Sequence, residues 1–199
     1  MRRFLLAVLA IAFGASAAVA ADTKAANAFV DKVASDTLVI VKSADPLPSK
    51  QAKLESLFKT NADIPFVAQF VLGRHWRAAS PAQQKAYVSA YEPFLMKHYV
   101  GRLLKYSGQS YKVANSRQDA DGGVVVTMEL VDPGKPSVFV DYRLRQEKAG
   151  YKVTDIIVEG VSLLNTQRSE FNSVVNSKGL DYLISALQKK AAAPITASN

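Results

Sequence analysis

The chain has 199 residues, with 25 lysines and arginines, 17 aspartates and glutamates, no cysteine and a formal net charge of +8. Without cysteine it can form no disulfide, thiolate metal site or thiol nucleophile, so its stability must come from an apolar core. The positive charges are scattered, which favours an evenly solvated surface over attraction to anionic lipid or an acidic partner, and no nucleic-acid recognition module is present.

The first twenty residues resemble a secretory signal peptide. Met1-Arg2-Arg3 is a short positive region, and residues 4–13 form an apolar run that is too short to span a bilayer. Ala18-Val19-Ala20 fits a cleavage site of the A-x-A type. We therefore expect a signal peptide over residues 1–20 and a periplasmic or secreted mature chain. A retained membrane anchor is the alternative.

The N-terminal half is predicted to be helical. Apolar residues recur at helical steps over residues 22–42, and a shorter helix is expected over 50–59. Residues 66–72 are apolar on most sides, which is typical of a helix that is deeply buried or lines a ligand cavity. Ser80-Pro81-Ala82-Gln83 carries a capping-box signal, and the helix that follows is predicted to reach about residue 106 with an aromatic stripe on one face.

The hydrophobic period then changes from 3.6 to 2, which indicates strands. Four strands are predicted, over residues 109–117, 124–131, 137–146 and 151–158. The short segments between them are rich in aspartate, glycine, proline and lysine, which predicts antiparallel hairpins. The third strand alternates between apolar and largely charged residues, so one side of the sheet is expected to pack against helices.

The last strand leads into an apolar elbow. It breaks at Glu159-Gly160, and the elbow, residues 161–164, precedes two short helices predicted over 168–175 and 181–187. We interpret the elbow as part of the wall or mouth of an apolar cavity in which the protein carries a lipid.

This order of elements predicts an α+β fold. N-terminal helices are expected to pack on a curved, four-stranded antiparallel sheet around a cone-like lipid cavity, which short C-terminal helices close. We expect one lipid-binding domain over residues 21–190 and a disordered tail over residues 191–199.

Few side chains suggest catalysis. His75 and His98 form no metal-ligand spacing, so His75 is expected at a helix end or surface and His98 as a hydrogen-bonded core residue. Ser162 lacks the second glycine of a nucleophile elbow, so a local hydrogen bond or a contact with a ligand headgroup is the favoured role. No phosphate loop, zinc motif or dinucleotide fingerprint is present, and we expect no catalytic residue, metal or cofactor.

Asp155 is the carboxylate of most interest. It is expected to share a strand face with Tyr151, Val153 and Ile157 and to be partly buried. A buried aspartate could act as a general base, but an ion pair with an arginine such as Arg143 or Arg168 is the favoured interpretation.

Several segments resemble one family of proteins. Residues 155–163, DIIVEGVSL, are similar to the D-x-x-x-E-G-V-S segment of the MlaC family of periplasmic phospholipid-binding proteins, also labelled as toluene-tolerance proteins. Further matches are VLGRHW at 71–76, SPAQQ at 80–84, the strand at 136–145 and KGLD at 178–181. The resemblance covers nearly the whole chain after the expected signal peptide, although Tyr151 stands where a tryptophan is expected in related chains.

The resemblance implies a function. It implies a periplasmic carrier of a Gram-negative bacterium that is not an enzyme and holds the acyl chains of a diacyl phospholipid between helices and a twisted sheet. It further implies lipid exchange with an inner-membrane ABC transporter complex and an outer-membrane lipoprotein–porin complex, which maintains the lipid asymmetry of the outer membrane. A branch of the family is linked to hopanoid-producing bacteria, so a hopanoid is an alternative cargo.

The energy of burying acyl chains indicates a deep pocket. Each methylene is worth roughly 0.8 kcal/mol, so two chains of about 16 carbons represent on the order of 25 kcal/mol and must be enclosed almost completely. The headgroup is then expected at the mouth, near solvent. The residues expected to contact lipid are Val67, Phe70, Val71, Trp76, Phe94, Tyr99, Leu103, Tyr142, Val161, Ser162 and Leu163.

Two other classes of function stay open from the sequence. One is a cone-fold enzyme that acts on a small apolar substrate with Asp155 as its base. The other is a protein-binding adaptor whose apparent cavity is simply packed core. The first predicts that turnover depends on Asp155, and the second predicts a tightly packed interior with no extractable lipid.

Overall fold

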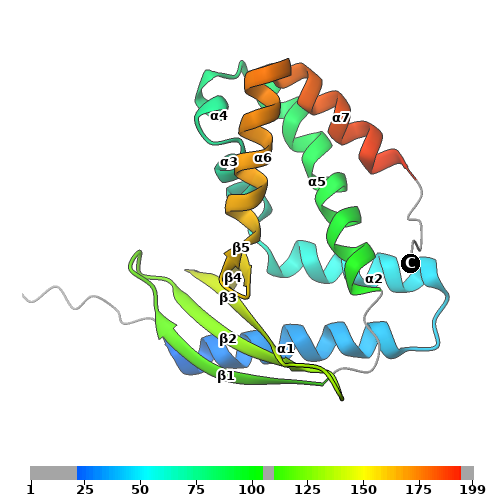
Figure 1. Ribbon diagram of the computed structural model, residues 1–199, viewed down its shortest axis with the longest axis vertical. Helices are drawn as coiled ribbons and strands as arrows, with labels where there is room; N and C mark the ends of the chain where they lie inside the picture. The colour runs from blue at the N-terminus through cyan, green and yellow to red at the C-terminus, as the bar shows by residue number, and fades with distance from the viewer. Residues whose placement is uncertain (1–21, 105–109, 194–199) are drawn as a thin grey trace, which may run out of the picture.

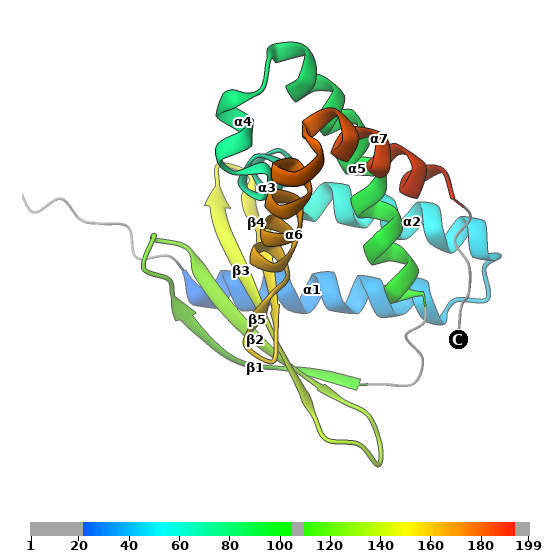
Figure 2. The same cartoon turned by 45° about the horizontal axis from the view of Figure 1, so that its top comes forward.

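The computed structural model describes residues 22–104 and 110–193. The expected signal peptide and residues 194–199 of the expected tail lie outside the described residues. Figures 1 and 2 show an antiparallel sheet with α1 lying along one of its faces and a group of helices standing above it. In chain order the helices and strands are α1 (Thr23–Lys42), α2 (Leu47–Asn61), α3 (Ile64–Leu72), α4 (Arg74–Ala78), α5 (Pro81–Leu103), β1 (Ser110–Gln118), β2 (Val124–Val131), β3 (Val138–Glu147), β4 (Gly150–Val158), β5 (Val161–Ser162), α6 (Leu163–Lys178) and α7 (Leu180–Ala192).

The predicted α+β class is confirmed, but the sheet formed by the described residues has five strands where we expected four. All neighbours pair antiparallel in the order β1-β2-β3-β4-β5. The additional strand is the first half of the elbow, because Val161 pairs with Val158 and Ser162 pairs with Ile157. Glu159 and Gly160 form the turn between them, with φ of 48° and 79°. Two successive residues with positive φ suit a tight hairpin, which explains the glycine at this position.

The helices differ from the prediction mainly at their ends. The short helix α4 was not predicted, and α6 begins at Leu163 where we expected a helix from residue 168. The earlier start is possible because the Ser162 hydroxyl accepts a hydrogen bond from the backbone N–H of Asn165 at 3.0 Å and caps the helix. Helix α7 continues to Ala192, two residues into the segment that we expected to be disordered. None of the helices in the described ranges is long and apolar enough to cross a membrane.

The apolar interior is divided into separate clusters. The largest lies among α3, α5, α6 and α7 and contains Tyr87, Tyr91 and Phe171. A second cluster joins α1 to the sheet through residues such as Val30, Val126 and Leu144, and a small third one joins α1, α2 and α5. The helical group and the sheet therefore each have a core of their own, and the surfaces between them do not merge into one continuous core.

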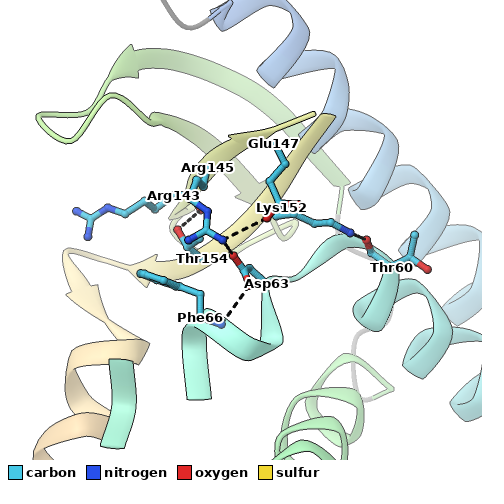
Figure 3. Close-up of polar contacts among 8 residues, drawn as sticks. All are labelled: Thr60, Asp63, Phe66, Arg143, Arg145, Glu147, Lys152 and Thr154. Atoms are coloured by element: carbon cyan, nitrogen blue, oxygen red, sulfur yellow. Dashed lines mark hydrogen bonds and ion pairs between the residues drawn. The ribbon is translucent and has the colours of Figure 1, made fainter. Parts of the chain in front are cut away.

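A polar junction fastens the start of α3 to the sheet (Figure 3). The Asp63 carboxylate accepts a hydrogen bond from the backbone N–H of Phe66 at 3.1 Å and also pairs with Arg145 on β3. The Arg145 guanidinium lies 4.9 Å from the centre of the Phe66 ring. The backbone N–H of Asp63 donates to the carbonyl of Val153 at 2.9 Å, and the Lys152 ammonium donates to the carbonyl of Thr60. Helices α2 and α3 are thereby held to β3 and β4.

We predict that Asp63→Ala lowers the free energy of unfolding by about 2–3 kcal/mol. The substitution removes the cap of α3, worth about 1 kcal/mol, and breaks an ion pair in which Asp63 is 8% exposed but Arg145 is 46% exposed, so solvent reduces the second contribution. Urea denaturation of the mature chain measures the change.

Asp36→Ala is the matched control for this prediction. Asp36 pairs with Lys32 one turn away on the exposed face of α1, at 2.8 Å. Its loss should change the free energy of unfolding by less than about 0.5 kcal/mol. If Asp63→Ala lowered the free energy of unfolding by as little as the control does, the junction would add nothing to stability.

Candidate functional site

An apolar cavity of about 340 Å³ lies between the helices and the sheet. Helices α1, α2, α3, α5 and α6 and strands β1 to β4 all contribute to its lining. Most of the lining side chains are aliphatic or aromatic, and the ionisable carboxylate and guanidinium groups among them belong to Asp155 and Arg102. A concave, mostly apolar space with a few polar groups is typical of a site for a hydrophobic ligand.

Some of the residues predicted to contact lipid line this cavity and others do not. Those in the lining are Val67, Tyr99, Leu103, Tyr142 and Leu163. Those outside it are Phe70, Val71, Trp76, Phe94, Val161 and Ser162. Val71 is buried in the helical core, Trp76 packs edge-on against Tyr87, and Val161 is 57% exposed on β5.

The sequence analysis missed most of the wall that α1, α2 and the sheet supply. The lining residues from these elements include Val33, Leu38, Leu54, Leu57, Phe58, Met128, Leu130, Ile156 and Val158. Their apolar spacing predicted amphipathic helices and strands, but the same spacing is found in residues that pack directly against a neighbouring element. The alternation along β2, where Met128 and Leu130 line the cavity, could have been used to place the inner face of the sheet against the ligand.

A bulge in β4 changes which residues face the cavity. Leu144 pairs with Val153 and Arg143 pairs with Asp155, so Thr154 is an extra residue on β4. Beyond this point the alternation is shifted by one residue, and Ile156 and Val158 line the cavity where an unbroken strand would have presented Ile157. The predicted common face of Tyr151, Val153, Asp155 and Ile157 is therefore wrong.

Asp155 caps the beginning of α6. One of its oxygens accepts the Ser162 hydroxyl at 2.6 Å, and the other accepts the backbone N–H of Leu164 at 3.1 Å. Its carboxylate is 5% exposed and lies where the helix dipole favours negative charge. The predicted ion pair with an arginine is wrong, because Arg143 pairs with Asp119 at 2.7 Å and the Arg168 guanidinium lies over the Phe70 ring.

Glu159 ties the 155–163 segment to the neighbouring strand β3. Its carboxylate accepts the backbone N–H of Phe139 at 2.6 Å, and its own N–H donates to the Phe139 carbonyl at 3.0 Å. Asp155, Glu159, Gly160 and Ser162 thus fix the path from β4 through the hairpin into α6. The segment sets the position of α6 against the sheet, and its last residue, Leu163, lines the cavity together with Leu164.

Two tyrosines and a glutamine bring further polar groups to the cavity. The Tyr91 hydroxyl donates to the side-chain carbonyl of Gln167 at 2.5 Å, and both residues are buried. Burial raises the pKa of Tyr91 well above its usual value, so its hydroxyl stays neutral. Burial also raises the pKa of Tyr99. The positive charge of Arg102 opposes this shift, whereas the negative charge of Asp155 adds to it.

The histidines lie away from the cavity lining. His75 is on α4 and shares a hydrogen bond of 2.9 Å with Asn172 on α6. His98, expected in the core, is instead exposed on α5, where its ring stacks on Phe94 with 5.8 Å between centroids. Within residues 22–104 and 110–193, no group of three or more histidine or acidic side chains is arranged to hold a metal ion.

Comparison with known proteins gives consistent matches. The family model described as MlaC protein matches residues 31–189. The chain is 23% identical over 137 residues to the intermembrane phospholipid transport system binding protein MlaC of Haemophilus influenzae, covering 67% of this chain and 64% of that one. It is 25% identical over 108 residues to the toluene tolerance protein ttg2D of Pseudomonas putida, covering 54% of this chain and 50% of that one. The matched region is therefore less than two thirds of the length of each of these relatives.

A solved structure matches more completely. A phospholipid-binding protein from Ralstonia solanacearum, solved in complex with a phospholipid, superposes with a TM-score of 0.71 at 28% sequence identity. The match covers 84% of this chain and 97% of that chain. The arrangement of helices over the sheet is thus shared with a protein whose structure contains a phospholipid.

We predict that Asp155 and Ser162 stabilise the fold as one unit. Ser162→Ala removes the cap of α6 and should lower the free energy of unfolding by about 1–2 kcal/mol. Asp155→Ala leaves the buried N–H of Leu164 and the Ser162 hydroxyl without their acceptor, and should lower it by about 2–4 kcal/mol. The double variant should lose less than the sum of the two single variants, as a double-mutant cycle by urea denaturation will measure.

The matched control is Ser169→Ala on the same helix. The Ser169 hydroxyl donates to the carbonyl of Asn165 at 3.0 Å on the exposed side of α6. Its removal should change stability by less than about 0.5 kcal/mol. Additive effects of the Asp155 and Ser162 substitutions would show that the two side chains do not act together.

Proposed function

This chain belongs to the MlaC family, and we propose that it is a periplasmic phospholipid carrier. In this proposal it shuttles lipid between an inner-membrane ABC transporter complex and an outer-membrane lipoprotein–porin complex, and so maintains outer-membrane lipid asymmetry. The observation that carries the proposal is the apolar cavity between the helices and the sheet. The match to a protein solved with a phospholipid, over 97% of that chain, supports the same cargo.

The size of the cavity argues that a ligand fills it. Empty apolar cavities destabilise closed cores by about 24 cal/mol per Å³, so leaving 340 Å³ empty would cost at most on the order of 8 kcal/mol, and less where the cavity opens to solvent. That is comparable with the whole stability of a typical domain, about 5–15 kcal/mol. A packed adaptor would have no reason to retain such a space, whereas a carrier needs it.

We propose that the cavity widens when a lipid with two long acyl chains enters it. The largest apolar clusters of the helices and of the sheet are separate, but a third cluster joins α1 to α2 and α5. In this proposal the helices shift about the attachments of Asp63 and Leu164 to β4, and the two parts stay joined.

We propose five of the predicted residues as direct lipid contacts, because their side chains line the cavity. These are Val67, Tyr99, Leu103, Tyr142 and Leu163. We add the apolar side chains of α1, α2 and the sheet that complete the lining. For the predicted residues outside the lining, contact with lipid stays a prediction that applies only to a widened cavity.

The expected processing of the chain belongs to the same proposal. Residues 1–20 would direct export and be removed, and one lipid-binding domain would then act in the periplasm over residues 21–190, with the remainder as a tail. The signal-like N-terminus supports this localisation.

The bonding of Asp155 favours a carrier over an enzyme. Both of its oxygens already accept hydrogen bonds from the N-terminal turn of α6, which gives the carboxylate a structural role. A general base needs an oxygen that can reach the substrate proton. A hopanoid remains an alternative cargo, since apolar walls alone do not distinguish it from acyl chains.

The direct test is native mass spectrometry of the mature chain, purified from periplasm without detergent, followed by lipid extraction. A stoichiometric added mass that resolves into diacyl phospholipid is the expected result. A bound hopanoid would keep the carrier and change its cargo. A protein that stays free of lipid after incubation with phospholipid vesicles would refute the carrier function.

We also predict that Val67→Glu reduces the bound lipid at least tenfold. Val67 lines the cavity, and a carboxylate there would lie against acyl chains, where charge is strongly disfavoured. Val39→Glu is the matched control, because Val39 is 68% exposed on α1. Both variants should keep the circular dichroism spectrum of the parent, and an undiminished lipid content in Val67→Glu would contradict the assigned wall.

A further inference from the structure

One polar side chain in the cavity wall lacks a partner for its donor. Gln167 on α6 is 8% exposed and lines the cavity. Its carbonyl oxygen is used, since it accepts the Tyr91 hydroxyl at 2.5 Å. Its amide nitrogen has no hydrogen-bond partner among residues 22–104 and 110–193. The nitrogen is not one of the fully enclosed atoms that lack a partner, so it stays accessible in the cavity wall and can donate to a ligand there.

A second donor without a partner lies on α5. The Tyr99 ring lines the cavity and is stacked on Phe58, with 6.0 Å between centroids and an interplanar angle of 16°. In the described part of the chain its hydroxyl has no hydrogen-bond partner. Because burial raises the pKa of Tyr99, the hydroxyl remains protonated and available as a donor.

Two opposite charges in the cavity lining restrict what these donors can bind. The Asp155 carboxylate also lines the cavity and is bonded to Leu164, which lies three residues before Gln167 on α6. Its negative charge also acts on Tyr99. The Arg102 guanidinium also lines the cavity and acts on Tyr99 in the opposite sense, so an anion at this level meets the Asp155 charge and a cation meets the Arg102 charge. A neutral acceptor such as a carbonyl oxygen satisfies both donors without either penalty.

We propose that Gln167 and Tyr99 recognise the ester carbonyls of a diacyl glycerophospholipid. This inference rests on the proposed function and narrows its substrate class to ester-linked lipids. The two ester carbonyls are the neutral acceptors that lie directly above the acyl chains, so a lipid with its chains in the cavity brings them to the wall. An ether-linked lipid with the same headgroup and chain length has no such carbonyl and leaves both donors unpaired.

The test is a competition between two lipids that differ only in this linkage. The mature chain is incubated with vesicles that contain equal amounts of dipalmitoyl phosphatidylglycerol and its dihexadecyl ether analogue. Protein and vesicles are then separated, and the bound lipids are counted by mass spectrometry. We expect the diester to exceed the diether by about 3- to 10-fold, which is the effect of one or two neutral hydrogen bonds.

Variants assign this preference to the two side chains. Tyr99→Phe keeps the stacked ring and removes the donor. Tyr91→Phe/Gln167→Leu removes both members of the buried pair, which avoids leaving the Tyr91 hydroxyl without an acceptor and is expected to fold. Each variant should lower the diester-to-diether ratio by about 2- to 5-fold, and the triple variant should bring it close to the ratio in the vesicles. Gln188→Leu, at an exposed position of α7, is the control and should leave the ratio unchanged.

Each outcome has a distinct meaning. Equal binding of the two lipids by the parent chain would overturn the inference and leave the carrier function intact. Variants that lose both lipids in parallel, with the ratio unchanged, would also overturn it, because the side chains would then only shape the cavity. Binding of neither lipid would refute the proposed function itself and the inference with it.

Discussion

The structure depends on how strand β4 is joined to the helices by polar groups along its edge. The Val153 carbonyl accepts the N–H of Asp63 at the start of α3, and Asp155 accepts the N–H of Leu164 at the start of α6. These attachments are only two residues apart on β4, and the helices that they hold are capped by the side chain of Asp63 at α3 and by those of Asp155 and Ser162 at α6. Two helix N-termini are thereby fixed to one strand through hydrogen bonds, so the facing apolar surfaces are not required to pack together.

The cavity follows from this arrangement. The helical group packs internally through aromatic residues such as Tyr87, Tyr91 and Phe171, with the first two stacked 5.4 Å apart. The sheet packs internally against α1. Each part is stable in its own contacts, and the cavity remains where the two would otherwise merge. An interior of this kind accepts an apolar ligand without first having to break a packed core.

The polar groups in the wall have different roles. Asp155 accepts a hydrogen bond at each of its oxygens and so orients α6, and Glu159 fixes the hairpin that precedes this helix. Gln167 and Tyr99 instead have donors that no described residue accepts. A uniformly apolar wall would hold any chain of suitable length. A wall with unpaired donors also selects for what the acyl chain is attached to, because a bound lipid that covers a donor without accepting its hydrogen bond removes it from water at a cost.

Local signals in the sequence determined the elements and their order. The helix from Pro81 was predicted by its capping box, which the structure contains, and the four longer strands were predicted by their period of two. The segment at residues 155–163 was identified from its sequence, but the sequence did not predict the structural role of each of its residues. Asp155 was predicted to pair with an arginine, but in the structure it caps α6. Its partner is the backbone N–H of Leu164, and a backbone group has no signature in the sequence. The bulge at Thr154 reversed the faces of β4 for the same reason, since register depends on the neighbouring strand. Apolar spacing alone thus identified amphipathic elements, while the tertiary structure decided which of their apolar faces meet each other and which line the cavity.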